Sequence, residues 1–216
     1  MQPQKGTYTN PADGKVYKTV KIGDQIWMAE NLNVSNYLNG DQIPEVYHKN
    51  KWGEITTGGW CHYDNEIKNE AIYGKLYNWH AVNDQRGLAP DGWHIPSDTE
   101  WKALESYLEL KNYEADNSGW RGKYVGDALK ETGIAHWKAP NDTATNSTRF
   151  TALPGGYRDV SGLFYVIGHS GYWWSSTRHK DFFAWYRSIY HSHREIHRTS
   201  GYEGDGFSVR CIKDTE

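Results

Sequence analysis

The stretch GWHIPSDTEWKALESYLEL, residues 92–110, carries the strongest structural signal in this chain. Ser97 and Glu100 have the spacing of a helix capping box. In that motif the serine hydroxyl accepts a backbone N–H of the first turn, and the glutamate carboxylate accepts the N–H of the serine. Trp101 and Leu104 then follow at the spacing of one helical face. The stretch therefore predicts an amphipathic helix that begins after Ser97 and packs its tryptophan side against a core.

Helical spacing is weaker elsewhere. Residues 72–81 have apolar side chains three and four positions apart, which predicts a short helix. A helical turn is also expected within residues 125–132, and residues 39–59 are rich in polar residues, glycine and proline, as loops are.

Strand patterns fill most of the remaining chain. Residues 16–22 and 26–28 predict two strands around a Gly-Asp turn, and strands and turns follow one another from Phe150 onward. Because the helices concentrate in the first half and antiparallel strands in the second, the expected fold class is α+β. Residues 1–12 are expected to be a flexible tail, and residues 13–216 a single domain.

Because the chain is poor in aliphatic side chains, its hydrophobic core is expected to consist largely of aromatic residues. The mean hydropathy is −0.87, a value that disordered chains also reach, but Trp, Tyr and Phe make up 15% of the chain. Since disordered chains are poor in aromatic residues, we expect a folded, loop-rich domain.

Charge and hydropathy exclude several classes of protein. The net charge is −3 with both signs mixed along the chain, so neither a nucleic-acid groove nor an acidic-lipid surface is indicated. No run of about 18 apolar residues could span a membrane, and the first residues lack the pattern of a signal peptide. The chain is therefore expected to be either cytoplasmic or the mature form of an extracellular or surface-displayed protein.

Cys61 and Cys211 are the only cysteines. Two cysteines do not establish an oxidising compartment, so a Cys61–Cys211 disulfide and two buried thiols both remain open.

Seven motifs occur in a characteristic order, and they are DGKVYKTVKIGDQIWMAENL, YGKLYNWHAV, PDGWHIPSDTEW, ALPGGYRD, GYWWSST, AWYR and GFSVRCIKD. From about Asp13 to Asp214, this series resembles the Fibrobacter succinogenes major paralogous domain. That family is similar in fold to C-type lectins, in the branch shared with formylglycine-generating enzymes. The resemblance implies a C-type-lectin-like fold with two main helices, a small antiparallel sheet and long ligand-facing loops. The cysteine that family members often have before PDGW is Ala89 here.

The resemblance carries over no chemistry. The formylglycine-generating enzymes need a reactive cysteine pair near the C-terminus, where this chain has only Cys211. The calcium-binding loop and strand motifs of sugar-binding C-type lectins do not occur in this sequence. His191, His193 and His197 have a spacing that could form part of a zinc site, but no fourth ligand stands at an obvious position. We therefore expect no catalytic residues, no metal and no cofactor.

The C-terminal third separates into two sets of residues. Trp185, Arg187 and Ile189 alternate with Tyr186, Ser188 and Tyr190 along a predicted strand, and the family commonly keeps the first set. Ile196 and Arg198 likewise share a face opposite His197. The first set is therefore interpreted as scaffold.

The second set is predicted to bind a ligand. Some C-type-lectin-like proteins are targets of diversity-generating retroelements, which randomise adenines and so reach Tyr, His, Asp, Ser, Thr, Gly, Arg and Phe, but not Lys, Glu or Trp. Within a variable region of about 178–205, the candidates that fit this set are Arg178, His179, Asp181, Phe182, Tyr186, Ser188, Tyr190, His191, Ser192, His193, His197, Thr199, Ser200, Gly201, Tyr202 and Asp205.

The favoured function is thus a non-catalytic ligand-binding protein, diversified on a fixed scaffold. Its expected partner is a protein or another cell-surface component, because an open aromatic and polar face suits an interface. An undiversified adhesin or carbohydrate-binding module is the alternative, and a formylglycine-generating-type oxidoreductase is a remote one.

Overall fold

The computed structural model describes residues 4–108 and 116–215. The α-helices are α1 (Lys49–Glu54), α2 (Glu70–Tyr73), α3 (Trp79–Val82), α4 (Asp98–Tyr107) and α5 (Val125–Leu129), and two 3₁₀ turns span Tyr63–Asn65 and Ile67–Asn69. The strands are β1 (Lys5–Thr9), β2 (Val16–Ile22), β3 (Gln25–Met28), β4 (Trp60–Cys61), β5 (Leu76–Tyr77), β6 (Trp93–His94), β7 (Gly119–Arg121), β8 (Tyr157–Arg158), β9 (Phe164–Tyr165), β10 (Ser170–Lys180), β11 (Phe183–Tyr190), β12 (Ile196–Tyr202) and β13 (Ile212–Lys213). This is a mixed α and β protein whose regular structure is mostly sheet.

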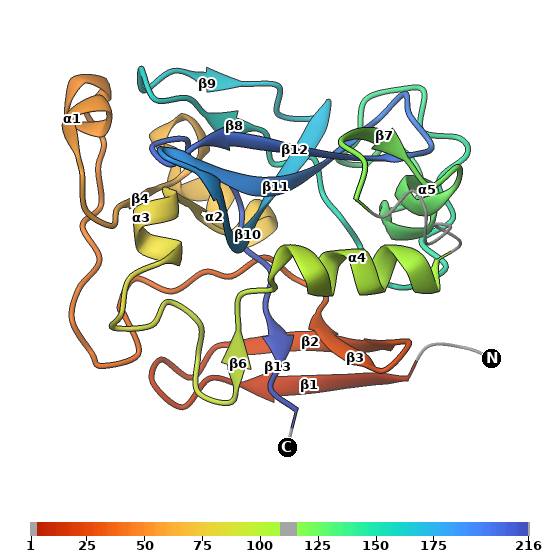
Figure 1. Cartoon of the computed structure of the whole chain (residues 1–216), viewed down its shortest axis with the longest axis horizontal. Helices are drawn as coiled ribbons and strands as arrows, with labels where there is room; N and C mark the ends of the chain where they lie inside the picture. Colours follow the sequence, from red (N-terminus) through yellow and green to blue (C-terminus); the bar gives the residue numbers. More distant parts are fainter. Residues whose placement is uncertain (1–3, 109–115, 216) are drawn as a thin grey trace.

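Two antiparallel sheets organise the domain. One has the strand order β1-β2-β3-β13-β6 and joins the N-terminal hairpin to the C-terminal strand. The other has the order β10-β11-β12-β7 and contains the predicted variable region. Helix α4 lies between the two sheets (Figure 1), so it contributes to the packing of both.

Tryptophans fill the space around α4, as expected from the composition. Trp27 of the first sheet packs on Trp101 of α4 with ring centroids 4.8 Å apart, and both belong to a cluster that includes Trp173 of β10 and Ile189 of β11. Each of these side chains is fully buried. One continuous core therefore links the first sheet, the helix and the second sheet.

Buried charges also tie α4 to the second sheet. Asp98 accepts hydrogen bonds from Arg187 of β11, at 2.9 Å, and from Arg198 of β12, at 2.9 and 2.7 Å. Glu105 lies about two turns further along the same face of the helix. It pairs with Arg187 and with Arg121 of β7. Burial raises the pKa of Asp98. The guanidinium groups of Arg198 and Arg187 lower it by more than burial raises it, so the pKa lies below its usual range. The residues predicted as scaffold are thus fixed by carboxylates on α4.

The capping box predicted at the start of α4 is confirmed. The Ser97 hydroxyl accepts the backbone N–H of Glu100 at 3.2 Å, and the Glu100 carboxylate accepts the Ser97 N–H at 2.7 Å.

We expect Ser97→Ala to lower the free energy of unfolding by about 0.5–2 kcal/mol in urea denaturation, because an N–H of the first turn loses its acceptor. Ser106→Ala is the control. It lies inside the helix, where alanine is the better helix former, and it should leave stability unchanged or slightly raise it.

The predicted strands at residues 16–22 and 26–28 are confirmed as β2 and β3, and the turn within residues 125–132 as α5. The prediction that residues 1–12 form a flexible tail is wrong from Lys5 onward. Residues Lys5–Thr9 form β1, an edge strand that pairs antiparallel with β2 and so satisfies the backbone groups along one of its sides. Residues 1–3 lie outside the described part of the chain.

The helix predicted over residues 72–81 is wrong as one element. Gly74 ends α2 at a φ of 70°, a backbone conformation that no helix continues. The chain then forms β5, where Tyr77 donates its backbone N–H to Phe207, and only afterwards turns into α3. The expected loop at residues 39–59 also contains helix α1, which buries Trp52. Among the described residues, α4 is the only helix longer than six residues, which differs from the two main helices expected.

Candidate ligand-binding face

The alternation predicted for β11 is confirmed. Arg187 and Ile189 are buried on the side of the sheet that packs on α4. Tyr186 and Tyr190, which point to the other side, are half-buried. Ile196 and Arg198 of β12 are buried beside Arg187, opposite the half-buried His197. Tyr186, Tyr190 and His197 therefore lie on the face opposite the scaffold residues. Ser200 and Tyr202 pair with Trp185 and Phe183, so these two candidates lie on the scaffold side of the sheet.

Part of the outer face is covered by the chain itself. Phe207 packs on Trp174 at 4.2 Å and on Tyr186 at 4.7 Å between ring centroids, and Tyr157 of β8 packs on Tyr172 at 4.7 Å. Burial raises the pKa of Tyr186 as a result. Tyr186 thus belongs largely to the core, although it lies on the predicted face.

The open part of the outer face centres on Trp120 of β7, which is 40% exposed. The His193 ring stacks on Trp120 at 3.9 Å and 7°, the Tyr190 ring meets it edge-on at 5.0 Å, and the His197 ring lies 4.7 Å away. The Tyr190 hydroxyl is in turn hydrogen-bonded to the hydroxyl of Tyr172 at 3.1 Å. We call Trp120, Tyr190, His193 and His197 the Trp120 patch.

A second exposed group surrounds the turn between β10 and β11. Phe182 is 74% exposed at a φ of 65°, and Tyr202, which packs on Phe183 at 4.5 Å, is 52% exposed. Arg178, His179 and Asp181 are also exposed there. We call Arg178, His179, Asp181, Phe182 and Tyr202 the hairpin tip. Because the tip and the Trp120 patch adjoin opposite ends of β11, they are separated by roughly 23 Å at the usual rise of a strand.

Four further candidates lie around these two groups. Thr199 and Ser200 are half-buried on β12 between them. Ser192 is exposed and within 3.2 Å of a ring nitrogen of His193, and the His191 ring lies 5.3 Å from that of His169.

Three of the sixteen candidates are buried, so they do not offer side chains to the surface. Ser188 is fully buried beneath the outer face. Asp205 accepts the backbone N–H groups of Val160 at 3.0 Å and Tyr202 at 3.1 Å, and burial raises its pKa to about 7. Gly201 is buried against that carboxylate, since a Cβ there would lie 3.1 Å from Asp205 Oδ2. Asp205 and Gly201 therefore pack together where β12 ends in the turn at residues 202–205.

The histidines do not assemble a metal centre. Among residues 4–108 and 116–215, no group of three His, Cys, Asp or Glu side chains is placed to hold a metal ion. His193 is stacked on Trp120 instead, and burial lowers the pKa of His197, with His193 and Arg121 adding to the effect.

Both cysteines are free and buried, which decides between the two alternatives left open by the sequence. Cys61 packs with Trp52 and Leu76, whereas Cys211 lies in a different cluster with Phe207 and Val209. Burial raises the pKa of the Cys61 thiol to about 12 and raises that of Cys211 as well. Neither thiol is poised to act as a nucleophile.

Trp120 is the residue of the face that sequence reasoning missed. It stands between glycines in the polar stretch NSGWRGK, and an exposed tryptophan in such a stretch is a signal for a contact residue. Its place beside His197 depends on the pairing of β7 with β12, which is a long-range contact.

The comparisons with known proteins give one match. A family model described as the Fibrobacter succinogenes major domain matches residues 20–213. No curated protein and no solved structure gives a significant match. None of the helices in the described part of the chain has the length and apolar character needed to cross a membrane.

Proposed function

The chain belongs to the Fibrobacter succinogenes major domain family, and we propose that it is a non-catalytic ligand-binding protein that uses the outer face of its second sheet for recognition. The observation that carries the proposal is the Trp120 patch. Side chains from β7, β11, the following loop and β12 gather there around one partly exposed tryptophan. Tyr and Trp are the side chains that most often dominate binding energy at interfaces.

The rigidity of the sheet supports this proposal. Arg187 and Arg198 are held from behind by Asp98, and Arg198 also lies over the Trp185 ring at 3.6 Å. Recognition residues are commonly presented by a fixed scaffold of this kind. The exposed side chains of the outer face can therefore change without loss of the frame.

We further propose that the fold is C-type-lectin-like and that a diversity-generating retroelement varies this face. Thirteen of the sixteen candidate positions are exposed or half-buried, which agrees with variation at a surface. Trp120 lies outside the set of residues that such variation reaches, so it would be a fixed member of the face.

The gene sequence tests whether these positions are diversified. The thirteen codons should nearly all end in the same pyrimidine, and a near-repeat with adenines at those codons should lie close by.

The alternative functions make different predictions. An undiversified adhesin or carbohydrate-binding module would use the same face, but its gene would lack the template. A formylglycine-generating-type oxidoreductase needs a reactive thiol, and the raised pKa values of the buried Cys61 and Cys211 oppose it. The ligand that we propose is a protein or another cell-surface component, which would place the mature protein outside the cell or on its surface.

Binding is tested first with a labelled sample of the protein on a glycan array and on an array of bacterial surface proteins. For the strongest hit, we expect Tyr190→Ala, His193→Ala and His197→Ala together to weaken binding at least about tenfold, because these partly exposed rings surround Trp120 and supply contact area. Tyr47→Ala with Tyr107→Ala is the control, since both residues are exposed on other elements. Equal affinity of the triple variant and the wild-type protein would rule out this face, and calcium-dependent binding to glycans would instead favour a lectin.

A further inference from the structure

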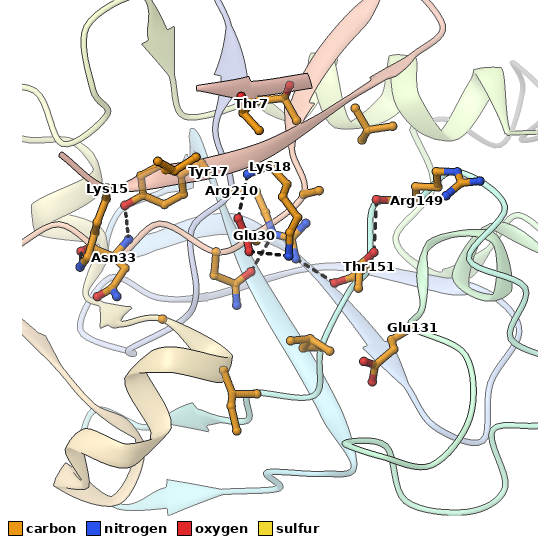
Figure 2. A pocket seen from close by; sticks show the side chains of 18 of the residues that line it. Thr7, Lys15, Tyr17, Lys18, Glu30, Asn33, Glu131, Arg149, Thr151 and Arg210 are labelled. Atoms are coloured by element: carbon orange, nitrogen blue, oxygen red, sulfur yellow. Dashed lines mark hydrogen bonds and ion pairs between the residues drawn. The ribbon is translucent and has the colours of Figure 1, made fainter. Parts of the chain in front are cut away.

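A cleft of about 950 Å³ lies apart from the proposed face. Its walls are β1, β2, the segment at residues 29–33, helix α2 and the loop at residues 146–153 (Figure 2). Pockets that bind small molecules span roughly 300–1,000 Å³, so the cleft has room for a ligand of that size.

The lining is cationic although the whole chain is acidic. The chain has 24 Lys and Arg against 27 Asp and Glu, whereas the cleft is lined by five cationic and three acidic side chains, namely Lys5, Lys15, Lys18, Arg149 and Arg210 against Glu30, Glu70 and Glu131. Lys18 pairs with Glu30 at 3.3 Å and Lys15 with Glu70 at 3.2 Å. Such a local excess of positive charge attracts anions into a cleft.

Arg210 is the most unusual of these cations because it is buried without a carboxylate partner. Its guanidinium donates to Asn31 Oδ1 at 2.7 Å and to the carbonyl oxygens of Phe150 and Thr151 at 2.6 and 3.1 Å. No ion pair to Arg210 is found within the described residues. Burial lowers its pKa to about 9, although the charge of Glu30 acts in the opposite direction. Glu30 also pairs with Lys18, so it compensates the charge of Arg210 only in part, and an anion in the cleft would stabilise that buried charge further.

The backbone of the same wall is strained. Asn146, Arg149 and Thr151 have φ values of 45°, 59° and 54°, in the left-handed region that β-branched residues such as threonine rarely adopt. Asn146 and Thr151 hold each other through two hydrogen bonds of 3.0 Å, and Arg210 holds the Thr151 carbonyl. All three strained residues line the cleft. Strained backbone of this kind gathers at ligand sites, where the surrounding contacts fix it.

Figure 2 shows Lys18, Glu30 and Arg210 together in the middle of the cleft, with Thr151 beside Arg210 and Arg149 farther along the loop. We propose that the cleft binds a small organic molecule through a carboxylate or phosphate group, which Lys18 and Arg149 contact while Arg210 stabilises it from the wall. This site is independent of the proposed recognition face, and each can fail without the other.

Titration calorimetry of the full chain tests the proposal, with sodium phosphate, sodium glucuronate and uncharged glucose as probes at constant ionic strength. We expect saturable binding of phosphate, glucuronate or both, and no binding of glucose. Binding of phosphate alone would identify a phosphate-bearing ligand, and binding of glucuronate alone a carboxylate-bearing one. Lys18→Gln and Arg149→Gln should each weaken binding by roughly tenfold, the effect of one charge-assisted hydrogen bond.

Lys21→Gln is the matched control, because Lys21 is exposed on the same strand as Lys18 but does not line the cleft. It should bind like the wild-type protein. The proposal is overturned if neither anion binds saturably, if glucose binds as well as glucuronate, or if Lys21→Gln weakens binding as much as Lys18→Gln does.

Discussion

Glu105→Ala is expected to lower the free energy of unfolding by about 3–5 kcal/mol, the usual cost of removing one partner from a buried ion pair. Glu105 is fully buried on α4, where its carboxylate faces both Arg187 of β11 and Arg121 of β7. The alanine variant leaves two buried guanidinium groups without that carboxylate. Guanidinium chloride denaturation followed by far-UV circular dichroism measures the change.

Two further variants separate the buried charge from other effects. Glu105→Gln keeps the volume and one acceptor oxygen, so it should cost less than Glu105→Ala. Glu54→Ala removes an exposed carboxylate that pairs with Lys51 at 3.0 Å, and it should change stability by less than about 1 kcal/mol. A loss below about 1 kcal/mol in Glu105→Ala would mean that the network does not hold the helix to the sheet.

Features fixed by near neighbours in the chain could be predicted. The capping box at Ser97 and Glu100 needs only residues three apart, and the alternation of Arg187 with Tyr186 follows from the twofold period of any strand. By contrast, the helical spacing at residues 72–81 continues through Gly74, whose φ of 70° divides the segment. Apolar spacing alone does not reveal that Tyr77 exchanges backbone hydrogen bonds with Phe207.

The side chains that β11 and β12 contribute to the candidate face could be predicted from the sequence. The side chain that β7, a strand distant in the sequence, contributes could not be predicted. Alternation assigned Tyr190 and His197 to the outer face, and both are partly exposed. Trp120 joins them only through the pairing of β7 with β12. Ser188 has the same alternation as Tyr190 but is buried, because neighbouring side chains cover the middle of a sheet more completely than its ends.

A second large effect should appear as a loss of stability between about pH 4 and pH 7, caused by Asp205. Burial raises the pKa of this carboxyl from 3.8 to about 7 in the folded protein. The unfolded chain therefore releases the proton at lower pH than the folded chain does, so the folded state binds more protons in this window and each rise in pH favours unfolding. Above pH 7 the loss is complete and constant. A shift of this size corresponds to at most about 4 kcal/mol.

Carboxylates with lowered pKa values act in a different window. Burial raises the pKa of Glu70, but the hydrogen bond from Asn33 and the charge of Lys75 lower it to about 2. This group stabilises the fold above its unfolded pKa near 4.5 and loses that contribution only as the pH falls toward 2. Its effect therefore lies below pH 4.5 and does not hide that of Asp205.

Asp205→Asn isolates the effect because an amide does not ionise while its oxygen can still accept one of the two backbone N–H groups, from Val160 or Tyr202. Urea denaturation from pH 4.5 to pH 8 should show the stability of Asp205→Asn rising relative to the wild-type protein by up to about 4 kcal/mol, and levelling off above pH 7. Asp181→Asn removes an exposed carboxylate at the hairpin tip and controls for the loss of one negative charge. If both variants follow the same course with pH, the effect belongs to net charge and not to the buried carboxyl of Asp205.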